Sequence, residues 1–472
     1  MRRRAGTQRW VVVLVTAVAL TSAACGARWD DDQKAAVLAR TQGGSGTSAD
    51  DSSGSSDEAV AGSPEAVGDA AAGSSSGGAT GAAGGRGGSG GTGKAAASAS
   101  GPRPCDAAST APGVTPKQIT LGTISTESGP IPGLGASALA AAQAYVAYRN
   151  STGGVCGRQL VLRTADDGAD NGRHRAAVND MSSKVLGLVG GVGGGDAGSG
   201  EAVVSLGMPV VTVAISDPYQ DAATVFDINP PLANPKGVIG KYRYLLDAGA
   251  KTVALVYPAT DQTRAEMQNK HKPLMEAAGI KVVLEHEFPL STLSFDSSAR
   301  AVANSKADYM FFLSEVGQSA GMAKSMYGSG YKLKFQEYIT YDEKFIDLAG
   351  DAAAEGVTAW IRNLPNEEPD SNAEQKAFLT WMDRTAPGVP ADTFAAESWA
   401  GAKAFLDSVV ALPGPITRPA LLAQLRGTET YDAGGFLGTL QLGKKKSNGC
   451  QVAMIVQGGK WKRLTPSKGF LC

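Results

Sequence analysis

Short runs of β-branched and aliphatic residues, apolar on both faces, limit the fold of this chain more than any other feature. The first four runs are 119–124, 160–165, 185–189 and 210–215. Helical patterns at 136–150 and 172–184 lie between them. Strands buried on both faces are typical of parallel sheets that helices cover on each side. The alternation therefore predicts an α/β fold.

A second series of the same kind follows further along the chain. It predicts a helix at 235–247, a strand at 252–257, a helix at 262–278 and strands at 281–287, 309–313 and 338–340. Gly249 and Gly279 stand where helix caps are expected. The globular composition covers roughly 370 residues, more than one hydrophobic core usually holds. We therefore expect two α/β lobes.

The first 25 residues have the layout of an export signal. Arg2, Arg3 and Arg4 precede an apolar stretch at 10–20, and the small residues at 22–24 lead to Cys25. The stretch is too short for a good membrane span. Cys25 resembles the lipid-accepting cysteine of a bacterial lipobox, which predicts a palmitate-type lipid anchor, and plain cleavage after Ala24 is the alternative. Either outcome places the mature protein outside the cytoplasm.

Residues 26–104 are dominated by Gly, Ser, Ala and Asp. Such a segment cannot bury enough apolar surface to offset the entropy of ordering it. It is predicted to be a disordered tether with a reach of roughly 50 Å. The formal net charge of the chain is -1, so no basic stripe of the kind that binds nucleic acid is indicated.

Four cysteines follow the signal, and an even number in an exported protein indicates disulfides. We predict the pairs Cys105–Cys156 and Cys450–Cys472, because the first two flank the first strands and the last two bracket the final hairpin. Metal binding is the alternative. No C-x-x-C pair or nearby histidine supports it.

The stretch LVGGVGGGDAGSGEAV contains Gly193, Gly195 and Gly198 in the order G-x-G-x-x-G, with Asp217 about twenty residues on. This is the pattern of a dinucleotide site. An exported protein would rarely meet such a cofactor, and the pattern belongs to the first strand of a domain, whereas this loop follows the third. No cofactor is therefore predicted.

Several segments in succession resemble landmarks of the type I periplasmic binding proteins, in particular the branched-chain amino acid (leucine-binding-like) and amide receptors of ABC importers. They are ITLGTISTESGPIPGLG, NSTGGVCGRQLVLRTADD, LGMPVVTVAIS, DAGAKTVALVY, MEAAGIKVV and FIDLAGDAAAEGV. The resemblance implies two Rossmann-like lobes with parallel central sheets, joined by a hinge of three crossovers. Lobe 1 would comprise 105–232 and 363–427, and lobe 2 would comprise 233–362 and 428–472.

The resemblance also implies a ligand site. The loop at Gly194, Gly195 and Asp196 would offer backbone amides to a ligand carboxylate, although relatives often carry a serine pair there. Ala214 and Ser216 match the segment whose carbonyl and hydroxyl hold an amino acid head group. Asp342 falls where relatives place an acidic residue against an α-ammonium, and a helix cap is its alternative role.

Other positions depart from the family's pattern. Leu134, Gln262 and Val316 stand where relatives often place aromatic rings around the ligand, and Asp196 adds a negative charge beside the expected carboxylate. Glu315 is expected either at the ligand or on a solvated rim. The resemblance therefore leaves the ligand open.

The function implied is that of a lipid-anchored solute-binding protein that closes over a small polar molecule and presents it to a membrane permease. The alternative is a sensory or structural lipoprotein with the same fold that binds a protein partner.

An enzyme is not expected. Gly317 to Gly321 fit the G-x-S-x-G pattern of hydrolases, but all three histidines precede Ser319, whereas such a hydrolase needs one later.

Overall fold

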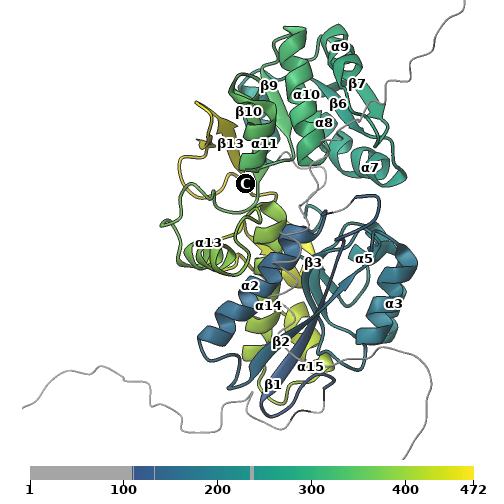
Figure 1. The fold of residues 1–472 in the computed structure, drawn as a ribbon, viewed down its shortest axis with the longest axis vertical. Helices are drawn as coiled ribbons and strands as arrows, with labels where there is room; N and C mark the ends of the chain where they lie inside the picture. Colours follow the sequence, from purple (N-terminus) through teal and green to yellow (C-terminus); the bar gives the residue numbers. More distant parts are fainter. Residues whose placement is uncertain (1–108, 110, 132, 234–238) are drawn as a thin grey trace, which may run out of the picture. The chain divides into compact units, whose positions relative to one another are not determined.

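The computed structural model in Figure 1 describes residues 109, 111–131, 133–233 and 239–472. The predicted signal at 1–25, the predicted tether at 26–104 and Cys105 lie outside these residues. Among the helices described, none has both the length and the apolar character needed to cross a membrane.

The first sheet has five parallel strands in the order β2-β1-β3-β4-β5. The strands are β1 (Gln118–Ser125), β2 (Gln159–Asp166), β3 (Leu188–Val192), β4 (Val210–Val213) and β5 (Val225–Asp227). The sheet and the helices on it are called lobe 1. The helices are α2 (Ala136–Ser151), α3 (Asn171–Met181), α4 (Gly200–Ser205), α5 (Asp217–Gln220), α13 (Ala373–Thr385), α14 (Thr393–Val410) and α15 (Arg418–Arg426), and η2 (Asp196–Gly198) is a 3₁₀ turn.

Helices cover both faces of this sheet, as the apolar strands predict. Leu121 and Val211 pack in one core with Trp399 of α14. Leu188 and Val210 face the opposite way and pack in a second core with Met181 of α3. Helices α2 and α14 lie against each other on the first face (Figure 1). In the edge strand β2, Leu160 is the one buried residue, and the other residues are exposed or partly exposed.

The second sheet has seven strands in the order β14-β13-β10-β9-β8-β6-β7. Its strands are β6 (Thr252–Pro258), β7 (Lys281–Phe288), β8 (Tyr309–Phe312), β9 (Phe335–Tyr338), β10 (Val357–Ile361), β13 (Val452–Val456) and β14 (Trp461–Thr465). The last two are antiparallel additions to a parallel sheet. The helices of this lobe 2 are α6 (Gly240–Asp247), α7 (Asp261–Glu266), α8 (Lys272–Ala277), α9 (Asp296–Ser305), α10 (Val316–Ser329), α11 (Glu343–Ala349) and α12 (Asp351–Ala354), with a π turn, η3 (Met267–His271), between α7 and α8.

Lobe 2 repeats the two-core plan. Val256 and Phe312 face a core that includes Phe345 of α11, whereas Leu255 and Phe311 face a core with α6 and α8. The second series of strands and helices is thus confirmed in order, with two differences: β9 ends at Tyr338, where the expected strand 338–340 began, and η3 interrupts the expected helix 262–278. Helix α6 begins at Gly240, and 234–238, where the expected helix began, lie outside the described residues.

The chain passes between the lobes three times: after β5, after β10, and before β13. The three connections run side by side, because isolated bridges join Leu232 to Ser447 and Asn363 to Leu437. The small hairpin β11 (Leu440–Gln441) and β12 (Lys446–Ser447), with the 3₁₀ turn η4 (Leu442–Lys444) between its strands, lies in the third connection.

One expected boundary differs in the structure. Lobe 1 was expected to end at 427, but Ala433, Phe436 and Leu440 are buried in the same core as α14 and α15. Their apolar side chains are buried in that core, which the chain passes before it reaches β13. The segment up to the β11–β12 hairpin therefore packs with lobe 1, and lobe 2 resumes with Val452.

Candidate functional site

The loops that follow β3 and β4 lie where ligands of open α/β sheets are usually held, at the carboxyl ends of the strands. Asp196, in the loop after β3, is only 2% exposed. Its carboxylate accepts hydrogen bonds from the backbone amides of Ile215, at 2.7 Å, and Ser216, at 3.2 Å, both in the loop after β4. The structure therefore brings together Asp196 and Ser216, two residues predicted from the sequence.

The glycines of the G-x-G-x-x-G pattern are needed for close packing. A Cβ on Gly195 would lie 2.3 Å from the backbone oxygen of Asp170, and one on Gly198 would lie 2.2 Å from that of Asn171. Both contacts are with the start of α3. These glycines thus allow two loops to pack backbone to backbone, and this packing accounts for the pattern without a bound pyrophosphate.

The amides expected to face a ligand are used inside the lobe. Gly194 donates its N–H to the hydroxyl of Thr126, at 2.8 Å, and Gly195 donates to the carboxylate of Asp167, at 3.0 Å. With Ile215 and Ser216 already bonded to Asp196, four amides in these two loops have protein partners. This differs from the expectation that Gly194 and Gly195 offer their amides to a ligand carboxylate.

Burial raises the pKa of the Asp196 carboxyl to about 6. The hydrogen bonds from Ser216 and Ile215 oppose this shift, and the charge of Asp227 adds to it. Asp227 is itself fully buried and accepts the N–H of Ala214 at 3.1 Å. The loop after β4 is thus held by two buried carboxylates.

A buried polar network beside Asp196 could not be predicted from the sequence. Nδ1 of His174 lies 2.7 Å from the hydroxyl of Ser199, and Asp167 accepts a hydrogen bond of 2.5 Å from Thr126. Burial lowers the pKa of His174 to about 4, and the nearby charge of Asp167 opposes this shift. His174, Asp167 and Ser199 have the composition of a catalytic triad. All three are nearly inaccessible, and the network therefore serves as internal support for the loops.

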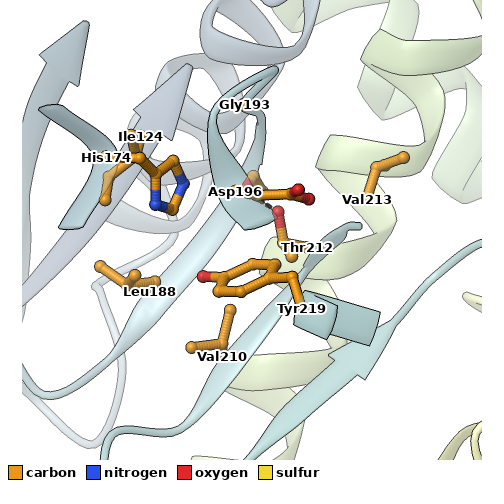
Figure 2. A pocket seen from close by; sticks show the side chains of 10 residues that line it. Ile124, His174, Leu188, Gly193, Asp196, Val210, Thr212, Val213 and Tyr219 are labelled. Atoms are coloured by element: carbon orange, nitrogen blue, oxygen red, sulfur yellow. Dashed lines mark hydrogen bonds between the residues drawn. The ribbon is translucent and has the colours of Figure 1, made fainter. Parts of the chain in front are cut away.

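Figure 2 shows a small cavity in this region, lined by His174, Asp196, Tyr219 and apolar side chains of β3 and β4. His174 and Tyr219 contact each other edge to face, with ring centroids 5.4 Å apart. The cavity volume is about 10 Å³, enough for about one water molecule. It is therefore no solute site.

An apolar patch lies next to the two loops. Leu134, Ile215 and Phe394 are partly exposed and pack over a small core of Ala138, Val192 and Val213. Leu134 lies just before α2, Phe394 lies in the first turn of α14, and Ile215 comes from the loop after β4. Lobe 1 thus presents an apolar surface beside Ser216.

Asp342, on lobe 2, caps a helix. Its carboxylate accepts the N–H of Lys344 at 2.8 Å at the start of α11, and its carbonyl accepts the indole N–H of Trp461 at 3.0 Å. Burial raises the pKa of this carboxyl. No hydrogen bond or ion pair joins Asp342 to Ser216 within the described residues.

The remaining predicted positions on lobe 2 are distributed over two helix starts. Gln262 is exposed in the first turn of α7, and Val316 is partly buried at the first residue of α10. Glu315 caps α10, accepting the amides of Gly317 and Gln318 at 2.6 Å each. Its carboxylate therefore has a structural role.

Two observations bring the lobes together near these residues. Nζ of Lys270, in η3, lies 3.8 Å from a carboxylate oxygen of Asp217 in α5. Burial raises the pKa of Asp392, which caps α14, to about 6, and the charge of Asp342 adds to this shift.

The residues of the G-x-S-x-G pattern, Gly317 to Gly321, lie in the first turns of α10. Ser319 is fully buried, and its hydroxyl contacts Thr340 at 3.0 Å and the carbonyl of Ser314 at 3.3 Å. No group of histidine, cysteine, aspartate and glutamate in the described residues is arranged to hold a metal ion.

The predicted disulfide between Cys450 and Cys472 is present. Cys156 is also disulfide-bonded, and its predicted partner, Cys105, lies outside the described residues, as does Cys25.

A family model described as periplasmic binding protein matches residues 118–460. Among solved structures, a fatty acid ABC transporter substrate-binding protein from Thermomonospora curvata is 19% identical, with a TM-score of 0.64, covering 76% of this chain and 94% of that one. A branched-chain amino acid transporter substrate binding protein from Streptococcus pneumoniae, solved with isoleucine, is 17% identical, with a TM-score of 0.60 and coverage of 74% and 100%. A leucine binding protein from Thermotoga maritima is 15% identical, also with a TM-score of 0.60, and coverage of 74% and 98%. No curated protein matches the chain. The predicted fold class is confirmed.

Proposed function

Because the chain belongs to the periplasmic binding protein family, we propose that it is an extracytoplasmic solute-binding protein that closes over a small polar ligand and delivers it to the permease of an ABC importer. The ligand is amino acid-like or amide-like in this proposal. The activity is binding, with no reaction and no cofactor.

The observation that carries the proposal is the contact between Asp217 of lobe 1 and Lys270 of lobe 2. It lies beside the loop that follows β4, where the predicted ligand residues are. Three adjacent connections between the lobes leave hinge closure as the motion that would make and break such a contact. We propose that lobe 1 comprises 105–232 and the returning segment from 363 through the β11–β12 hairpin. Lobe 2 is the remainder of the folded chain.

The proposed ligand contacts come from both lobes. On lobe 1 they are the carbonyl of Ala214 and the hydroxyl of Ser216, with the loop of Gly194, Gly195 and Asp196 behind them. On lobe 2 they are Gln262, Val316 and Asp342. A ligand ammonium near Asp342 would also lower the repulsion between that carboxylate and Asp392.

The anchor in this proposal is a lipid on Cys25, followed by a tether to the folded lobes. A sensory or structural lipoprotein of the same fold is the second candidate. It is favoured by the departures from the family's ligand-facing residues at Leu134, Gln262 and Val316, which the resemblance associates with aromatic rings.

A thermal-shift screen of the full chain tests the proposal. The panel comprises amino acids, their amides, urea, aromatic acids and fatty acids, because binding to the native state alone raises stability by RT ln(1 + [L]/Kd). At a concentration of 100 times Kd the gain is about 2.7 kcal/mol. A rise in melting temperature with one chemical class supports solute binding. No response across the panel favours the sensory or structural alternative.

A further inference from the structure

The amides of Ile215 and Ser216 are held by a carboxylate that belongs to the protein itself. The Asp196 oxygens lie 2.7 Å from Ile215 N and 3.2 Å from Ser216 N. This is the segment where the family resemblance places the head group of an amino acid ligand. These two amides are thus unavailable to a ligand carboxylate, as are those of Gly194 and Gly195, to which the resemblance assigns it.

The occupant cannot easily be displaced. Asp196 is 2% exposed, and its acceptors are tied to two amides of a different loop. Hydrogen bonds to a charged acceptor are roughly twice as strong as neutral ones, and removing them would leave a buried charge without partners, which is strongly unfavourable. Movement of this side chain away from the amides is therefore disfavoured.

A second carboxylate beside it would be repelled. Two unit charges 4 Å apart near a protein surface interact with an energy of about 4 kcal/mol at an effective dielectric constant of 20. The neighbouring amides of Gly194 and Gly195 are bonded to Thr126 and Asp167 and offer no compensation. The surface that remains beside the loops is the apolar patch of Leu134, Ile215 and Phe394.

We infer that Asp196 is a built-in substitute for the ligand carboxylate, and that it selects amines or neutral amides with an apolar part over α-amino acids and other carboxylates. This inference rests on the proposed solute-binding function. It assigns to Asp196 a role in specificity that acts through Ile215 and Ser216, without contact between Asp196 and the ligand.

Chemical rescue tests the occupancy without knowledge of the ligand. Asp196→Gly removes the side-chain methylene and its carboxylate, a fragment that acetate replaces. We expect the variant to melt below the parent and 50 mM acetate to raise its melting temperature by about 2 °C or more. Acetamide, the neutral isostere, should raise it less.

Asp170→Gly is the matched control, because the Asp170 carboxylate accepts one exposed amide, that of Arg173 at 2.7 Å. Acetate should give this variant no more stability than it gives the parent. Equal effects of acetate and acetamide on Asp196→Gly would overturn the assignment. If Asp196→Gly does not fold, Asp196→Ala with formate gives the same comparison.

Selection is tested with leucine and leucinamide, which differ only in the carboxylate. The parent should respond to leucinamide at least tenfold more strongly, measured as the ratio of concentrations that give equal thermal shifts, and Asp196→Gly should lose most of this preference. Tighter binding of leucine by the parent would contradict the inference. A failure of the proposed function is distinguishable, because the parent would respond to neither probe while acetate rescue persisted.

Discussion

The carboxylates of Asp196 and Asp342 both accept backbone amides, and they differ in what surrounds them. Asp196 bridges two loops of lobe 1 from a buried position. Asp342 caps α11 at a partly exposed position on lobe 2. A capping residue can therefore also bind a ligand, and the two roles can be separated by substitution.

Asp342→Asn and Asp342→Ala separate them. Asparagine is as good an N-cap as aspartate, whereas alanine loses about 1 kcal/mol of stability. For a ligand with an ammonium group, both substitutions should weaken binding roughly 30-fold or more, because an unpaired buried charge costs about 2 to 5 kcal/mol. Calorimetry with the ligand from the screen and urea unfolding of both variants measure the two effects. If Asp342→Asn binds as tightly as the parent, Asp342 is a cap alone.

The buried His174 makes stability depend on pH. Its pKa is about 4 in the folded protein against 6.5 for a free histidine. Because the unfolded chain binds the proton more tightly, this group's contribution is fully present above pH 6.5 and is lost as pH falls toward 4. Between pH 8 and pH 5 the loss should be about 2 kcal/mol.

The comparison with His174→Asn isolates this effect, because Asp196 and Asp392, with pKa values raised to about 6, act in the opposite direction in both proteins. The difference in unfolding free energy between parent and variant should shrink by about 2 kcal/mol from pH 8 to pH 5. A difference that stays constant over this range would show that His174 is not held neutral.

At the scale of elements, α15 is joined to the rest of lobe 1 through the side chain of its first residue. Arg418, at its first residue, donates to four backbone carbonyls, those of Ser182, Val185, Leu186 and Leu206, at 2.6 to 3.2 Å. Burial lowers the pKa of this guanidinium. One side chain thus ties a late segment of the sequence to the loops around β3.

Arg418→Met should destabilise the protein by about 2 to 4 kcal/mol, because several carbonyls lose their donor together. Arg418→Lys should recover part of this loss. Arg426→Met is the control on the same helix, since among the described residues Arg426 donates to one carbonyl, that of Ala223 at 3.3 Å, and it should cost less than about 1 kcal/mol. Equal losses for the two methionine variants in urea unfolding would contradict this account.

Strand and helix types were predictable because burial on both faces and helical spacing are local patterns. The expected helix at 136–150 agrees with α2 to one residue. The expected strand at 185–189 is displaced, since β3 begins at Leu188 and runs through Gly190 and Gly191, whose φ angles of +57° and +81° only glycine adopts easily. Sequence patterns treat such glycines as the end of a strand.

The hydrogen-bond partners of the candidate site residues were not predictable. The resemblance located the loops after β3 and β4, but the hydrogen bonds of Asp196 join residues 19 and 20 positions apart. Likewise, Arg418 reaches carbonyls more than 200 positions away. No local pattern encodes such contacts, because they depend on which loops the fold brings together.

At the scale of the whole molecule, the central claim is that a ligand is enclosed between two lobes that open and close. Asp217 and Lys270 approach from opposite lobes, at 3.8 Å. Joining them covalently should hold the lobes closed. Lys272 and Glu285, which pair at 2.6 Å within lobe 2, provide a matched pair whose joining leaves the lobes free.

The most direct test is the dissociation rate of the ligand found in the screen, measured after a short bismaleimide has joined the cysteines of Asp217→Cys/Lys270→Cys with the ligand bound. The account predicts that this rate falls at least tenfold compared with the same variant before joining, while Lys272→Cys/Glu285→Cys shows no change. An unchanged rate in the joined Asp217–Lys270 variant would contradict enclosure of the ligand between the lobes.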